Sequence, residues 1–303
     1  MHEILLLCLG LVLSVSLLVL LAQKLKIAYP IFLVAAGLLL GFIPGIPNTQ
    51  INPDLVFLII LPPILYDAAQ NTSWKALWRW RRIISAMALG FVLFTATSVA
   101  LVSYYLIPGF TLAQGFLLGA IVSPPDAAAA TAILRFVKLP KGLVSILEGE
   151  SLLNDATSLT IFRFALLAIV SNQFTWQQAA GGFVLVVISG IVIGLAIAFI
   201  FYAVFRWLPT TANLNITLSI VLPYLIYVTA EALHSSGVLA VVSGGLFIAY
   251  QNHFVFSHSS RLRSNAIWSS LVFILNAVVF FLIGLQLPEI LHSVKDGMLF
   301  TSI

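Results

Sequence analysis

Long apolar segments separated by short loops are the feature that most constrains the fold of this chain. Ten of them can be delimited, at residues 4–22, 28–46, 54–70, 82–106, 112–135, 144–170, 179–206, 214–232, 236–250 and 265–288. An apolar helix of about 20 residues is long enough to cross a bilayer. Only 8% of the residues are charged, compared with about 25% in a typical soluble domain. The pattern predicts an all-α polytopic membrane protein with about ten transmembrane helices.

Several classes of function are excluded by what the sequence lacks. The 14 Lys and Arg residues are scattered over the chain, so they form no nucleic-acid-binding patch. The sequence contains neither a P-loop nor a GxGxxG motif, so no nucleotide partner is expected. Cys8 is the single cysteine, and the five histidines, in loops or tails, lack metal-ligand spacing. We therefore expect no cofactor and no enzymatic activity.

The basic residues of the loops predict the orientation in the membrane. Twelve of the 14 lie in the odd-numbered loops, and the even-numbered loops contain none. By the positive-inside rule the odd loops are cytoplasmic and the N-terminus lies outside. We expect a multi-pass protein of the plasma membrane, which would be the inner membrane of a bacterium. The 12 residues are Lys24, Lys26, Lys75, Arg79, Arg81, Arg82, Arg135, Lys138, Lys141, Arg206, Arg261 and Arg263.

The segment Trp74–Arg82, with the sequence WKALWRWRR, combines aromatic and basic residues. Such segments are typical of membrane interfaces, where Trp rings and long basic side chains lie at the headgroups. We favour an interfacial anchor here. A sensor of lipid or pH is the alternative.

Two consecutive prolines interrupt the segment at 112–135. Pro124 and Pro125 donate no backbone N–H, so the carbonyls of Ala120 and Ile121 lose their helical partners. Ser123 can cap a new half-helix, with Asp126 at the third position after it. Because broken helices at membrane depth line cavities or are buried in protein, we predict a cation site beside Asp126. The alternative is that Asp126 only caps its half-helix.

Polar residues follow two neighbouring stripes of the predicted helix at 144–170. Glu150 and Asn154 are four residues apart, and Ser151, Asp155 and Ser158 follow steps of four and three. Asp155 lies about 16 Å from the cytoplasmic end of this helix, near mid-bilayer. The carboxylate on the broken helix is predicted at the same depth. Helix–helix adhesion alone is the alternative role for this stripe.

Other ionisable residues within the spans are candidate functional residues, because a charged side chain is costly inside the membrane. Arg163 is two turns beyond Asp155, and snorkelling to the outer headgroups is the favoured interpretation. Asp67 lies near the inner end of its span, where an interfacial position and a buried ion pair are equally compatible with the sequence. Glu148 and Glu231 lie near span ends.

These motifs resemble those of the monovalent cation:proton antiporters, on the NhaP-like and Na⁺/H⁺ exchanger branch. The matching segments are LPPILYDAA at 61–69, GAIVSPPDAAAATAIL at 119–134, LEGESLLNDA at 147–156, EALHSSGVLAVVSGGL at 231–246 and FILNAVVFFLIGLQL at 273–287. The resemblance implies an inverted-repeat antiporter-type fold. It also implies a homodimer in the lipid bilayer.

The resemblance further implies roles for particular residues. Asp126 and Asp155 would bind the transported cation, Ser151 would be an additional ligand, and Glu150 and Asn154 would form a supporting pair that orients the site. The Asn154-Asp155 pair contains one carboxylate instead of two. In this respect the sequence resembles the electroneutral branch of the antiporters. Pro125 replaces the Thr that commonly precedes the first of these Asp residues, so a side-chain ligand is missing.

The resemblance also suggests how the chain is organised. Residues 1–78 would form scaffold and dimerisation helices, 79–175 the ion-translocating bundle and 176–303 a partial second repeat. The resemblance implies an architecture of about 13 spans with two broken helices. This sequence contains one broken helix and reaches Ile303 without the second. We therefore expect a fold that lacks the last spans. Asp67 would have found an ion-pair partner in that second broken helix.

The sequence thus predicts secondary antiport of a monovalent cation against protons, with a role in pH and sodium homeostasis. Na⁺ is the favoured cation, and Li⁺ or K⁺ are possible. The cation and the proton would compete for Asp126 and Asp155. The alternatives are a non-transporting, truncated remnant of such an antiporter and a cation channel.

The charge distribution generates a test of topology. A cysteine introduced at Lys75 should be shielded from impermeant thiol reagents added outside intact cells, whereas one at Thr49 should be labelled. The unmodified chain, with Cys8 alone, gives the background signal. The opposite labelling pattern would overturn the orientation.

Overall fold

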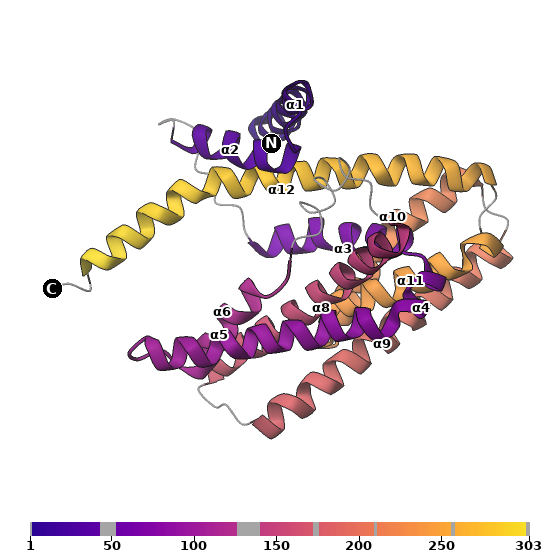
Figure 1. The fold of residues 1–303 in the computed structure, drawn as a ribbon. Helices are drawn as coiled ribbons and strands as arrows, with labels where there is room; N and C mark the ends of the chain where they lie inside the picture. Colours follow the sequence, from indigo (N-terminus) through magenta and orange to yellow (C-terminus); the bar gives the residue numbers. More distant parts are fainter. Residues whose placement is uncertain are drawn as a thin grey trace. The chain divides into compact units, whose positions relative to one another are not determined.

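The computed structural model describes residues 2–42, 53–125, 140–171, 176–208, 211–255 and 258–300. Every regular element in these ranges is a helix (Figure 1). The chain divides into two compact units. The first contains Met1–Pro53, Ala128–Lys138 and Ile267–Ile303, and the second contains Asp54–Ala127 and Leu139–Ala266. The all-α class predicted from the sequence is confirmed.

The first unit contains α1 (His2–Leu25), α2 (Tyr29–Gly41) and the later part of α12 (His258–Phe300). Two glycines allow α2 and α12 to approach closely. A Cβ atom at Gly37 would collide with the Phe281 carbonyl, and one at Gly284 with the Val34 carbonyl. The buried core of this unit draws on all three helices through Val15, Val19, Leu33, Ala277 and Phe281.

The second unit contains the helices with the predicted ion-binding residues. α4, the π-helical turn η1 and α5 follow one another without interruption, as one helix of 33 residues from Trp74 to Leu106. The elements of this unit are α3 (Pro53–Asn71), α4 (Trp74–Ser85), η1 (Ala86–Phe91), α5 (Val92–Leu106), α6 (Leu112–Val122), α8 (Lys141–Ser171), α9 (Trp176–Trp207), α10 (Ala212–Ala232) and α11 (Gly237–Val255).

The ten apolar segments predicted from the sequence each coincide with a helix or, for 28–46 and 112–135, begin on one and extend beyond the described residues. Five helices within the described residues are long and apolar enough to cross a membrane. They are Trp74–Leu106, Gly142–Val170, Gly181–Trp207, Ala212–Ala232 and Ser260–Pro288. Shorter apolar helices cover Leu9–Leu25, Tyr29–Gly41, Leu112–Val122 and Gly237–Gln251. The number of membrane crossings and the functional division at residues 78 and 175 stay predictions.

Helix α6 begins at a capping box that Thr111 and Gln114 form. The Thr111 hydroxyl oxygen accepts the Gln114 N–H at 3.3 Å, and the Gln114 side-chain oxygen accepts the Thr111 N–H at 2.8 Å. Two donors that a helix start leaves without intrahelical partners are thus satisfied. The helix therefore has a well-defined start and presents its other end to α8.

Glycines on α6 place this helix directly against the backbone of α5 (Figure 1). A Cβ atom at Gly115 would lie 2.7 Å from the carbonyl oxygen of Ala100, and one at Gly119 would lie 2.5 Å from that of Ala96. Membrane helices associate through such small residues because close backbone approach maximises van der Waals contact. The contact fixes the segment that leads into the two prolines.

This packing predicts the effect of adding one methyl group. Gly119→Ala should lower the stability of the purified protein by about 1–3 kcal/mol, the usual cost of overpacking. Gly181→Ala on α9 is the matched control, because no atom lies within 4 Å of a Cβ there. Thermal unfolding in detergent measures both. Equal melting temperatures for the two variants would contradict the close α5–α6 contact.

Candidate functional site

The end of α6 is a helix break whose freed backbone groups are partly satisfied by Ser123. Ser123 keeps helical dihedral angles, and its N–H donates to the Gly119 carbonyl at 3.0 Å. Its hydroxyl donates to the Ala120 carbonyl at 3.3 Å. Pro124 follows and donates no N–H, which ends the helix as the sequence predicted. The Ala120 carbonyl, which the prolines were predicted to leave without a helical partner, thus accepts a hydrogen bond from a side chain instead.

Helix α8 carries four of the predicted site residues near its centre, on two stripes. Glu150 and Asn154 are both buried, with 5% and 0% of their surface exposed. The Asn154 amide oxygen and nitrogen have no hydrogen-bond partner among the described residues. A buried amide without partners typically costs about 1–3 kcal/mol. This stripe therefore places a buried amide that the described residues leave unsatisfied next to a buried carboxyl group.

Two of the three residues of the second stripe of α8 face a cavity of about 340 Å³, which also touches the end of α6. Asp155 and Ser158 line it from α8, as their spacing predicted, and Pro124 lines it from the break. Ser158 also donates a hydrogen bond to the Asp155 main-chain carbonyl at 3.1 Å, so its hydroxyl is already engaged. The remaining lining is apolar: Leu61, Ala120, Ile121, Leu159 and Phe162. Asp155 thus lines a largely apolar cavity beside the end of α6.

The other predicted residues have different positions. Asp126 lies outside the described residues. Ser151 is half-buried on α8 and does not line this cavity. Asp67 on α3 is half-buried and hydrogen-bonds with the Asn71 side chain one turn away. No ion pair of Asp67 is found among the described residues, so the choice between an interfacial position and a buried ion pair stays a prediction.

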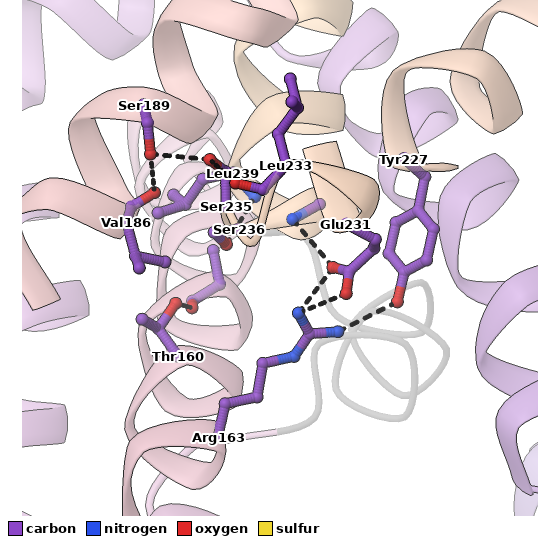
Figure 2. Close-up of polar contacts among 12 residues, drawn as sticks. Thr160, Arg163, Val186, Ser189, Tyr227, Glu231, Leu233, Ser235, Ser236 and Leu239 are labelled. Carbon is purple, nitrogen blue, oxygen red and sulfur yellow. Dashed lines mark hydrogen bonds and ion pairs between the residues drawn. The ribbon is translucent and has the colours of Figure 1, made fainter. Parts of the chain in front are cut away.

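A second polar cluster joins α8 to α10 (Figure 2). The Arg163 Nη1 atom donates to Glu231 Oε1 at 2.6 Å and to Oε2 at 2.7 Å, and Nη2 donates to the Tyr227 hydroxyl at 3.3 Å. This corrects the interpretation that Arg163 snorkels to the outer headgroups. A carboxylate on a neighbouring helix offers the guanidinium a charged partner, which water or headgroups would otherwise supply.

Glu231 also organises the connection between α10 and α11. Its Oε1 accepts the backbone N–H of Gly237, the first residue of α11, at 3.1 Å. A carboxylate at a helix start satisfies a free donor and interacts favourably with the helix dipole. The neighbouring Ser235 hydroxyl donates to Ser189 on α9 at 2.8 Å (Figure 2). The sequence identified Glu231 only as an ionisable residue near a span end.

Comparisons with known proteins agree with the fold and with the motifs. The profile of a family described as "Sodium/hydrogen exchanger, transmembrane" matches residues 10–302. The solved structure of the sodium proton antiporter MjNhaP1 from Methanocaldococcus jannaschii superposes with a TM-score of 0.74, at 20% sequence identity, and the match covers 94% of this chain and 73% of that one. The structural match confirms the antiporter-type helical fold.

Characterised relatives are similar over most of this chain. The "Sodium, potassium, lithium and rubidium/H(+) antiporter" of Bacillus pumilus is 34% identical over 87% of this chain and 40% of its own length. The "Low-affinity Na(+)/H(+) antiporter NhaS1" of Synechocystis is 31% identical over 90% of this chain and 51% of its own length. The chain thus spans about half the length of the curated relatives it matches.

The Arg163–Glu231 pair generates a prediction on stability. Arg163→Gln and Glu231→Gln should each lower the melting temperature, because each leaves the other charge without its partner. The double variant should lose less than the sum, with a coupling on the order of 1 kcal/mol, as for polar pairs in other membrane proteins. Thermal unfolding of the four proteins in detergent measures this. Strictly additive losses would show that the two side chains do not interact.

Proposed function

The chain belongs to the sodium/hydrogen exchanger family, and on this premise we propose that it exchanges a monovalent cation for protons across the plasma membrane. Na⁺ is the favoured cation, with Li⁺ or K⁺ as further substrates. The names of the relatives, which describe Na⁺/H⁺ antiport and antiport of several monovalent cations, support this substrate class. The fold supports a transporter rather than an enzyme.

The observation that carries the proposal is the position of Asp155. Asp155 lines the same cavity as Pro124, so an ionisable residue and the end of α6 share one site. Carboxylate and carbonyl oxygens are ligands suited to hard cations. In other transporters, discontinuous helices near the bilayer midplane form the binding sites for substrate and coupling ion.

Asp126 would supply the second carboxylate of this site, and Ser151 a further oxygen. Glu150 and Asn154 would orient the site from the buried stripe of α8. The Asn154 amide supports this role, because it is fully buried and has no partner among the described groups. Such an amide has donors and an acceptor available for a carboxylate or for the hydration of a cation.

The mechanism requires only competition at one site. When a proton occupies Asp155, the carboxyl group is neutral and attracts a cation weakly. When a cation binds Asp155 and Asp126, it favours the ionised carboxylates and displaces the proton. Because each ligand excludes the other, downhill movement of one drives the other when the site alternates between the two sides of the membrane.

Further features of the proposal follow from the family resemblance. The single carboxylate of the Asn154-Asp155 pair suggests exchange of one cation per proton, which is electroneutral. The protein would act as a homodimer and contribute to pH and sodium homeostasis.

Substitution of the central carboxylate tests the proposal. Asp155→Asn should abolish exchange, because Asn neither releases a proton nor balances the charge of a cation. The measurement is the dissipation of a pH gradient on addition of Na⁺ to proteoliposomes, at several pH values. In the unmodified protein, the apparent affinity for Na⁺ should fall as the pH drops through the range in which the carboxylate takes up its proton.

Two further variants complete this experiment. Asp67→Asn is the matched control, since Asp67 does not line the Asp155 cavity, and it should retain exchange. Asp126→Asn should abolish exchange if Asp126 binds the cation. It should be nearly silent if Asp126 is only a cap, because Asn is a good N-cap residue. Wild-type exchange in Asp155→Asn would show that the proposed site is wrong.

A further inference from the structure

A second cavity in the same unit is apolar and has no part in the proposed transport. It measures about 540 Å³, within the range of about 300–1,000 Å³ that is usual for ligand sites. Its walls come from α4, α8, α9 and α11 and consist almost entirely of hydrocarbon and aromatic groups. The lining residues are Trp74, Leu153, Ile191, Leu195, Leu239, Val242, Ser243, Leu246, Phe247 and Tyr250.

The one aliphatic hydroxyl among the lining residues, that of Ser243, is already engaged. The Ser243 hydroxyl donates to the Ala240 carbonyl at 3.1 Å and to the Ile191 carbonyl at 3.4 Å. Water in a cavity needs two to four polar partners, and this lining offers too few of them. An apolar occupant is therefore favoured over water or ions.

The length and position of the cavity match a lipid chain in one leaflet. Its lining on α11 runs from Leu239 to Tyr250, which corresponds to about 16 Å of helix. One leaflet contributes about 15 Å of hydrocarbon. In the orientation predicted by the loop charges, Tyr250 is at the cytoplasmic end and Leu239 lies deeper in the bilayer. Trp74 packs edge-on against Tyr250 at that end, with 5.9 Å between ring centroids.

Helix α4 places a basic surface next to this end of the cavity. Lys75, Arg79 and Arg82 follow steps of four and three residues, so they share one stripe, and all three are exposed. The neighbouring stripe contains Trp74, stacked on Trp78 at 6.1 Å, and Arg81, whose guanidinium lies 4.6 Å from the Trp78 ring centroid. The helix carries no acidic residue. Clusters of basic residues at the cytoplasmic surface of a membrane attract anionic headgroups.

From these observations we infer that the α4–α8–α9–α11 cavity binds one acyl chain of an anionic phospholipid from the cytoplasmic leaflet, with its headgroup on the basic stripe of α4. The apolar lining holds the chain, and the charge complementarity selects the headgroup. The segment Trp74–Arg82 is then a specific lipid site as well as an interfacial anchor. The inference is independent of the proposed antiport, because the Asp155 cavity shares no lining residue with this one.

Native mass spectrometry of the purified protein tests the headgroup. The probes are phosphatidylglycerol and phosphatidylcholine with identical acyl chains, added to delipidated protein in detergent. We expect phosphatidylglycerol to be retained at lower concentration. Lys75→Gln should weaken this preference about fivefold, the contribution of one basic residue near an anionic surface. Lys24→Gln on α1 is the matched charge control and should leave the preference unchanged.

A second pair of variants tests the cavity itself. Leu246→Trp fills the cavity and should reduce the retention of both lipids, whereas Leu185→Trp, at an exposed position of α9 outside the lining, should not. Leu239→Phe is a smaller filling change in case the first variant does not fold. Equal retention of the two lipids, an equal effect of Lys24→Gln, or unchanged retention in the folded filling variants would each overturn the inference.

Discussion

The absence of water inside the bilayer is the constraint on which the structure depends. Every backbone N–H and C=O at that depth needs a partner within the protein. Continuous helices meet this need without further help, and the long helix from Trp74 to Leu106 is an example. The end of α6 is one exception among the described residues, because Pro124 cannot donate. There the Ser123 hydroxyl supplies one missing bond to the Ala120 carbonyl, and α5 packs closely along the same helix.

The same constraint governs where charges are found. Arg163 and Glu231 satisfy each other across two helices, and Glu231 in addition holds the start of α11. Asp155 lies on the same helix and lines a largely apolar cavity together with Pro124. The polar residues of α8 thus face two different surroundings, a cavity beside the end of α6 and a charged partner on α10.

Apolar packing completes the arrangement, and it is uneven. Glycines bring α6 against α5, and α2 against α12, until the backbones touch. Between α4, α8, α9 and α11 the helices leave a space instead. Protein interiors are normally packed as densely as organic crystals, so a large apolar space is either a ligand site or a source of instability. Its place beside a basic helix favours the ligand site.

The sequence by itself determined the helices, the break at Pro124 and the polar stripes of α8, because these depend on residues that are near one another along the chain. It also placed Asp155 on the stripe that lines a cavity. It did not predict the bond between Arg163 and Glu231, which are 68 residues apart. It did not predict the apolar cavity, whose lining comes from four helices. Periodicity on one helix identifies a face, but only the tertiary structure decides which helix that face meets.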